Sequence, residues 1–131
     1  MKPDTEIKTD VYKVIKGSAL EAAVSGELRK TKRPFNSDKE DIVISVLDNG
    51  SGQIQEAFVN VNIYVPDIER GNQYEEDSLR CDELSKIAVN VLGRYNGGSF
   101  RFVLDKQRLL EVNGKNEHCI NNRLLYKQSN E

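Results

Sequence analysis

Strict alternation of apolar and polar residues marks one strand more clearly than any other feature of the chain. From Ala57 to Val65 the odd-numbered residues are apolar, and the even-numbered ones are Phe58, Asn60, Asn62 and Tyr64. Side chains alternate between the two faces of a strand, so this pattern predicts a long antiparallel strand with one buried and one uncovered face. Pro66 is expected to end it.

A second strand is predicted just before the first one. Asp41 to Asp48 is rich in β-branched residues and almost continuously apolar, which is typical of a central strand. The segment from Asp48 to Gly52 contains residues that accept a positive φ, so it predicts a turn. Together these segments predict a β-hairpin.

The main helix is predicted over Glu75–Leu92. Apolar residues recur there at steps of three and four, acidic residues fill the first turns, and Gly93 follows the end. The helix is therefore expected to bury Leu79, Leu84, Ile87, Ala88 and Val91. The segment Asp67–Tyr74 before it is polar and predicts a loop.

The N-terminal region predicts a broken helix. Asp10 has the character of an N-cap for a short helix from Val11 to Lys16, which Gly17 interrupts. Ser18 and Glu21 have the spacing of a capping box, which opens a second segment over residues 19–25 with Gly26 at its C′ position. Residues 1–8 are polar and are expected to be flexible.

Further strands are predicted towards both ends of the chain. The basic stretch 27–35 favours a short edge strand, while 99–105, 107–112 and 117–127 follow two Gly-containing turns. The order of elements predicts an α+β fold with an antiparallel or mixed sheet packed against two helical segments. We expect a single domain over residues 9–128, between flexible ends at 1–8 and 129–131.

Composition and charge narrow the class of protein. The chain has 131 residues, of which 37% are hydrophobic, a length typical of one domain. Its 19 basic and 21 acidic residues give a net charge of -2, which argues against a protein that binds nucleic acid constitutively. There is no apolar run of about 18 residues and no signal-peptide core, so neither a membrane nor secretion is expected.

Candidate chemistry is sparse. Cys81 and Cys119 lie far apart and are expected to be reduced, partly buried thiols of a cytoplasmic protein. His118 adjoins Cys119, but neighbouring side chains of a strand point to opposite faces, which is unfavourable for a nucleophile and its base. The acidic residues around 67–77 lack the spacing of a calcium loop, and the glycines at 93–98 lack the pattern of a phosphate loop. We therefore predict no catalytic, cofactor-binding or metal site.

Two features suggest contact with another protein. The first is the run of cations formed by Arg29, Lys30, Lys32 and Arg33; the alternative is a solvated edge strand that discourages unwanted pairing. The second is the even-numbered face formed by Phe58, Asn60, Asn62 and Tyr64, because asparagine is disfavoured in strands and two of them do not suit a core. Here the alternative is a solvated face.

The order of elements resembles that of the tail terminator, or tail completion, proteins of long-tailed bacteriophages. The segment Leu20-Glu-Ala-Ala-Val24-Ser-Gly26 corresponds to the end of the N-terminal helix in that family. The alternating strand then precedes a long helix, and final strands end in a segment like His118-Cys-Ile-Asn-Asn-Arg-Leu-Leu-Tyr126. The resemblance covers residues 10–127. The charged segment 29–39 departs from the family, in which many members have a more apolar strand.

This resemblance implies a protein of the virion or host cytoplasm that stops tail polymerisation and joins two assemblies. Such proteins form a ring, typically a hexamer, which caps the tail tube and joins it to head-completion proteins. In that setting we add the loop residues Asp48, Asn49, Ser51 and Gln53 as candidate contacts. Two alternatives stay open: a protein-binding adaptor or regulatory domain of a mobile element without ring formation, and an enzyme that uses Cys81 or His118.

Overall fold

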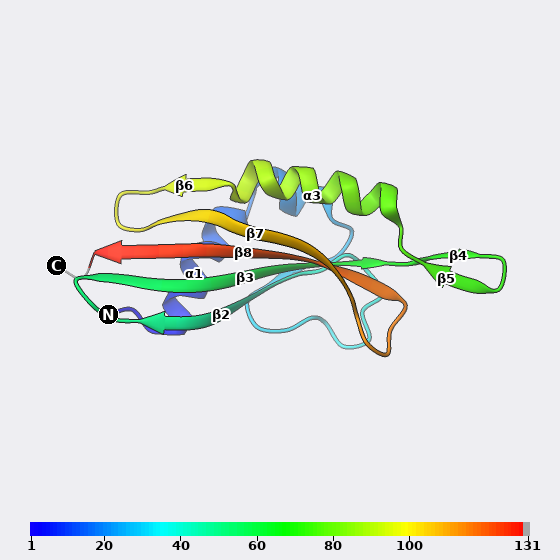
Figure 1. Ribbon diagram of the computed structural model, residues 1–131, viewed down its shortest axis with the longest axis horizontal. Coiled ribbons are helices and arrows are strands. Elements are labelled where there is room, and N and C mark those ends of the chain that lie inside the picture. Colours follow the sequence, from blue (N-terminus) through cyan, green and yellow to red (C-terminus); the bar gives the residue numbers. More distant parts are fainter. Residues whose placement is uncertain (130–131) are drawn as a thin grey trace.

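The computed structural model describes residues 1–129, which form three helices, a six-stranded sheet and a separate two-stranded hairpin. The fold is α+β, as predicted (Figure 1). The helices are α1 (Asp4–Ile15), α2 (Ala19–Ala23) and α3 (Ser78–Leu92). The strands are β1 (Leu28–Arg29), β2 (Ile42–Gly50), β3 (Ile54–Pro66), β4 (Ile68–Arg70), β5 (Gln73–Glu75), β6 (Arg94–Asn96), β7 (Arg101–Glu111) and β8 (Glu117–Ser129).

The main sheet is mixed and has the strand order β1-β2-β3-β8-β7-β6. β1 runs parallel to β2, and every other pair in this sheet is antiparallel. The predicted alternating strand is confirmed as β3, with Val59, Val61 and Ile63 fully buried. The predicted hairpin with β2 and the end of the strand at Pro66 are confirmed as well.

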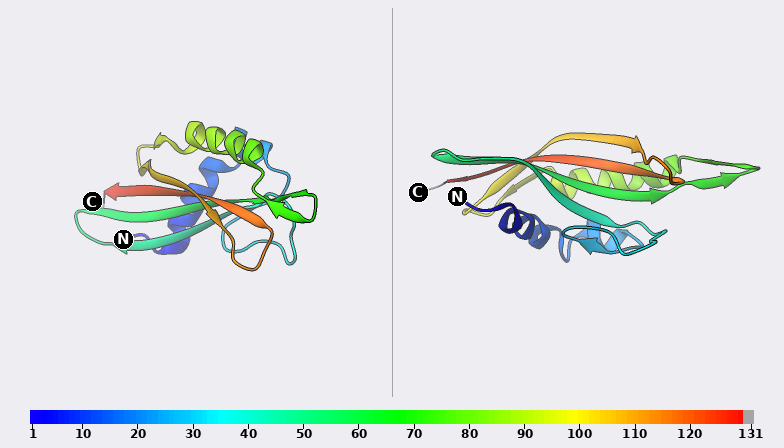
Figure 2. Two further views of the ribbon diagram at one scale, coloured as in Figure 1. Left: turned by 45° about the vertical axis from the view of Figure 1, so that its right-hand side comes forward. Right: turned by 90° about the horizontal axis from the view of Figure 1, so that it is seen from below.

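The helices α1 and α2 lie on one face of the sheet, and α3 lies beside β7 (Figure 2). Between these helices and the sheet is a single hydrophobic core, to which α1 contributes Ile7, Val11 and Ile15, and α3 contributes Leu84 and Ala88. The opposite face of the four long strands carries no helix of residues 1–129. That uncovered face is the one turned towards the reader in Figure 1.

The N-terminus differs from the expectation that residues 1–8 are flexible. Ile7 is fully buried, because it continues the four-residue spacing of Val11 and Ile15 on the same side of α1. The buried side chain of Gln55 accepts a hydrogen bond from the N–H of Lys2 and donates one to its carbonyl, both at 2.8 Å. Because α1 begins at Asp4, Asp10 lies inside this helix and is not its N-cap.

Other boundaries also need correction. Residues 67–74, predicted to be a loop, take part in the β4–β5 hairpin, and α3 begins at Ser78 behind an Asp77 N-cap. Leu79, predicted to be core, is 74% exposed, because this start places it on the solvent side of the first turn. Segments 99–105 and 107–112 form one strand, β7, with an irregularity between Leu104 and Lys106, and β6 was not predicted.

The break between the first two helices follows the capping chemistry that the sequence predicts. Gly17 has a positive φ of 78°, and the Ser18 side chain accepts a hydrogen bond from the N–H of Glu21. Gly26 has a different role from the predicted C′ residue. Its Cα approaches the Glu40 carbonyl and the Asp41 carboxylate so closely that a β-carbon there would collide with both. Residues 130–131 of the predicted flexible C-terminus lie outside the described part of the chain.

Candidate functional site

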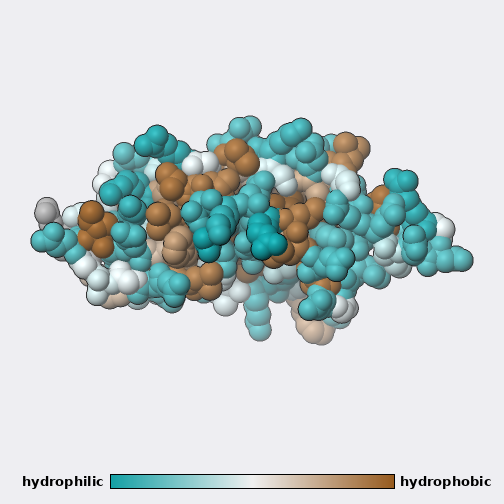
Figure 3. All heavy atoms as spheres, in the orientation of Figure 1, coloured by the Kyte–Doolittle hydropathy of each residue, from teal (hydrophilic) through white to brown (hydrophobic). Residues whose placement is uncertain are grey.

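The uncovered face of β2, β3, β8 and β7, which we call the open face, has regular cross-strand rows of side chains. One row is apolar across all four strands, because Leu47 lies opposite Phe58, Phe58 opposite Leu125, and Leu125 opposite Val103. We call these four residues the apolar row. Leu47 is 45% exposed and Val103 is 41% exposed, so both ends of the row are open to solvent in the described chain. Figure 3 views this face, on which brown apolar patches are separated by teal polar side chains.

The four residues predicted to lie on an uncovered strand face do so, and all are half-buried. Asn62 accepts a hydrogen bond from the side chain of Asn121 on β8 at 2.7 Å, which explains how asparagine is accommodated in mid-strand. The Arg123 guanidinium lies 4.6 Å from the centre of the Phe58 ring and donates to Asp105. Next to the apolar row, this face therefore carries polar side chains that bind one another.

The open face gathers cations that are scattered along the sequence. Arg101 lies opposite Lys127, Lys106 opposite Arg123, and Arg94 opposite Val103. Five of its cations form no ion pair with a described residue: Arg94, Arg101, Lys106, Arg108 and Lys127. Acidic side chains also occur there, since Glu56 lies opposite Lys127 and Asp105 is held by Arg123. The face is basic in sum, although the whole chain carries a net charge of -2.

Sequence reasoning missed this concentration of charge. These cations do not form a run in the sequence, because they come from three strands. Only the register of β6, β7 and β8 brings them to one face. Alternation within residues 101–127 gives a partial signal. It is broken by the irregularity at Asp105, which shifts every later side chain of β7 relative to β8.

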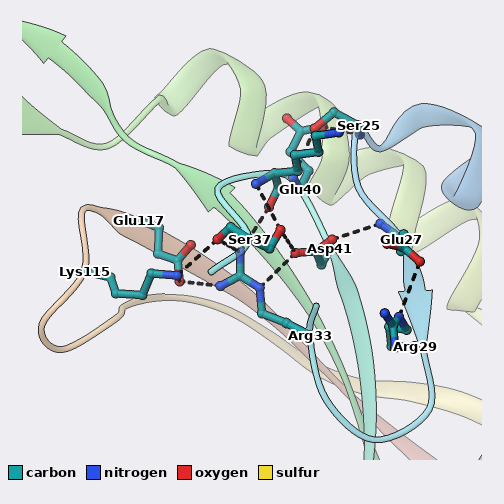
Figure 4. A network of polar contacts seen from close by, with 10 residues as sticks. Ser25, Glu27, Arg29, Arg33, Ser37, Glu40, Asp41, Lys115 and Glu117 are labelled. Atoms are coloured by element: carbon teal, nitrogen blue, oxygen red, sulfur yellow. Dashed lines mark hydrogen bonds and ion pairs between the residues drawn. The ribbon is translucent and has the colours of Figure 1, made fainter. Parts of the chain in front are cut away.

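The predicted basic segment divides into two parts, and Arg33 belongs to the interior. Its side chain is 15% exposed and forms ion pairs with Asp41 at 3.0 Å and Glu117 at 2.6 Å (Figure 4). The guanidinium also lies 4.3 Å from the centre of the Tyr64 ring. Two predicted interface residues, Arg33 and Tyr64, thus contact each other. Loop 31–41 therefore covers the open face near Tyr64.

Asp41 is the centre of this buried network. Burial by itself would raise the pKa of its carboxyl group, but hydrogen bonds from the Ser37 hydroxyl and the Glu27 N–H, together with Arg33, outweigh burial and leave the pKa below its ordinary value. Glu40 next to it is in a similar position: burial opposes ionisation, and the bidentate Arg80 lowers the pKa. Both carboxylates are therefore structural.

Arg29, Lys30 and Lys32 are exposed along the β1 edge, as expected for a solvated or contacting surface. Arg29 makes an exposed ion pair with Glu27 at 3.4 Å, and the Lys30 ammonium lies 5.5 Å from the Tyr12 ring centre. Exposed pairs of this kind contribute at most about 1 kcal/mol. These cations lie on the strand edge beside α1, away from the apolar row.

The predicted loop contacts lie at the β2–β3 turn. Asp48 has a positive φ of 34° at an irregularity of β2, and Ser51 and Gln53 are exposed. Asn49 instead faces the N-terminus. Its amide donates to the Lys2 carbonyl at 3.1 Å and to the Asp4 carboxylate at 2.8 Å. Asn49 therefore anchors the start of α1.

The thiols are buried and protonated at neutral pH. Burial, assisted by Glu117, raises the pKa of Cys119 to about 12, and burial with nearby acidic groups raises that of Cys81 to about 11. The His118 side chain is only 13% exposed and lies 2.6 Å from the Asp67 carboxylate through Nδ1. The His118 ring is therefore engaged with an acid, not with Cys119.

A cleft of about 530 Å³ opens between the β4–β5 hairpin and the β7–β8 turn. Several acids line it, including Glu75, Glu76 and Glu111, and the remaining lining residues include Tyr74 and Lys115. Across residues 1–129, no group of three or more His, Cys, Asp or Glu side chains has a geometry suited to a metal ion. The cleft is nonetheless an acidic concavity at one end of the molecule.

Comparison of the sequence with protein-family models and with curated proteins finds no match. Among the helices of residues 1–129, none combines the length and the apolar character that crossing a membrane requires.

Proposed function

We propose that this chain is a structural assembly protein that binds copies of itself and a tube-like partner, in the manner of phage tail terminator proteins. The observation that carries the proposal is the open face, where four strands present an apolar row beside cations that form no ion pair with a described residue. An apolar centre with a charged rim is the anatomy of a protein–protein interface. A face built only for solvation would place polar residues at Leu47 and Val103 as well.

The order of elements also supports the proposal. The broken N-terminal helix, the β2–β3 hairpin, the long helix α3 and the closing strands follow one another as in the family that the sequence resembles. In such an assembly the ring caps the tail tube and offers its other side to head-completion proteins. A ring of identical subunits needs two different complementary surfaces on each subunit.

Native mass spectrometry and sedimentation velocity on the untagged chain test the proposal. We expect concentration-dependent association into a closed species, typically a hexamer, which negative-stain microscopy would image as a ring. The same measurement is repeated with the tail-tube protein encoded nearest to this chain in its genome. A chain that stays monomeric in both experiments contradicts the proposal, and binding of one partner in a one-to-one complex would support the adaptor alternative instead.

A further inference from the structure

One end of the open face is built for an acidic, partly apolar partner. The apolar row lies there together with Arg94, Arg101 and Lys127, and we call this surface the basic end. Arg94 and Arg101 are exposed, and none of the three cations is ion-paired within the described chain. Burying Leu47 and Val103 against a partner would remove apolar area from water, while the cations would select the partner's charge.

Two kinds of partner fit this surface poorly. The same face of another copy would set cations against cations, which is unfavourable. A single-stranded nucleic acid needs aromatic rings on which its bases can stack. Here the guanidinium of Arg123 lies over Phe58, and that of Arg33 lies over Tyr64, so both rings already have a partner.

The opposite end of the same molecule has the complementary character. The β4–β5 hairpin projects there, at the far end of the long axis from the β2–β3 turn (Figure 1). Around the hairpin and the start of α3, Tyr74 is 52% exposed and Leu79 is 74% exposed. They lie among the acids Glu69, Glu75 and Glu76, of which Glu75 forms an ion pair with the exposed Arg70 at 2.7 Å, and the acidic cleft opens beside them. We call Tyr74, Leu79 and these three acids the acidic end.

We propose that copies of this chain associate head to tail, with the basic end of one copy against the acidic end of the next. This inference rests on the proposed function and names the surfaces that would join its subunits. The contact uses two different patches on each copy, so it is heterologous and closes into a ring when the rotation between copies permits. Exposed apolar side chains meet at its centre, and opposite charges meet at its rim.

Charge exchange tests the pairing directly. The variant Arg101→Glu/Lys127→Glu reverses the basic end, and Glu69→Lys/Glu76→Lys reverses part of the acidic end. Each is expected to weaken self-association by about tenfold or more in sedimentation velocity at moderate salt. The variant with all four changes restores complementary charges between copies and is expected to regain most of the association. Such recovery would not occur if the double variants had simply lost their fold.

The matched control for the basic end is Lys13→Glu/Lys39→Glu, which lowers the net charge as much as Arg101→Glu/Lys127→Glu does. It acts at two exposed lysines elsewhere and should leave association unchanged. If the wild type associates and both double variants associate equally well, the head-to-tail pairing is wrong while the assembly function stands. A wild type that never associates removes the proposed function itself. Tight binding of a fluorescent single-stranded oligonucleotide, lost in Arg101→Glu/Lys127→Glu, would also overturn the proposal.

Discussion

The hydroxyl of Tyr126 donates a hydrogen bond to the Asp10 carboxylate at 2.7 Å, joining the last strand of the sheet to the first helix. Tyr126 is fully buried, and Asp10 also receives the Lys2 ammonium at 2.7 Å. The contact connects residues that are 116 positions apart and places a charged acceptor at the rim of the core. Asp10 thus stabilises the docking of α1 from inside the helix.

Removing this hydroxyl should destabilise the fold measurably. Tyr126→Phe keeps the buried ring and deletes only the donor, so the free energy of unfolding should fall by about 1.5–3 kcal/mol, the range for a hydrogen bond to a charged group. Urea denaturation followed by circular dichroism measures the change. Tyr74→Phe is the control, because that hydroxyl is on an exposed residue, and it should have an effect below about 0.5 kcal/mol. Equal effects of the two substitutions would contradict this role of Asp10.

Substitution of Arg33 should have a larger effect. Arg33→Met removes the cation that lies between Asp41 and Glu117, which are 1% and 4% exposed, and leaves two buried carboxylates without it. We expect a loss of about 3–5 kcal/mol in the free energy of unfolding. Arg29→Met removes an equally charged but exposed residue and should change stability by at most about 1 kcal/mol. If both variants unfold at the same urea concentration, the buried network is not structural.

The same network makes stability depend on pH in the acid range. The pKa values of Glu40 and Asp41 are lower in the folded chain than in the unfolded chain. Their contribution is therefore present above the unfolded pKa, about 4, and is lost as pH falls through the folded values. Urea midpoints measured from neutral pH downwards should decline in that window. The decline should be shallower in Asp41→Asn, whereas the exposed Glu75→Gln should leave its steepness unchanged.

Thiol reactivity reports on the closed core. With pKa values of about 11 and about 12, Cys81 and Cys119 are almost entirely protonated at pH 8, and both are buried. Ellman's reagent should therefore react slowly with the native chain and rapidly with two thiols in urea. Cys81→Ser should reduce the final count by one thiol without creating a fast phase. A rapid native reaction would show that one thiol is accessible.

The sequence predicts best those elements whose pattern is local and complete. β3 is recognised by its alternation, and the break at Gly17 by capping chemistry that involves only neighbouring residues. α1 was underestimated because the polar residues around Ile7 conceal a four-residue spacing that continues through Val11 and Ile15. The spacing itself is visible in the sequence. The hydrogen bonds that hold Lys2 are not, because their partner, Gln55, lies 53 positions away.

The surfaces were harder to predict than the strands. Arg33 belongs to a basic run that the sequence predicts to be exposed. In the structure it is half-buried and forms ion pairs with Asp41, eight positions away, and with Glu117, 84 positions away. Conversely, Arg94, Arg101 and Lys127 carry no signal as isolated residues, and they form a basic surface only through strand register. A charge pattern along the chain describes a surface only where the neighbours in space are also neighbours in sequence.

The position of β8 has a consequence for synthesis on the ribosome. β8 is the last strand of residues 1–129, but it lies in the interior of the sheet, between β3 and β7, and pairs with β3 along its whole length. Until residues 117–129 leave the exit tunnel, the nascent chain holds the β2–β3 hairpin with one edge open and its core side exposed. The sheet therefore cannot close until β8 has emerged, and until then the open β3 edge is exposed to chaperones and to mispairing.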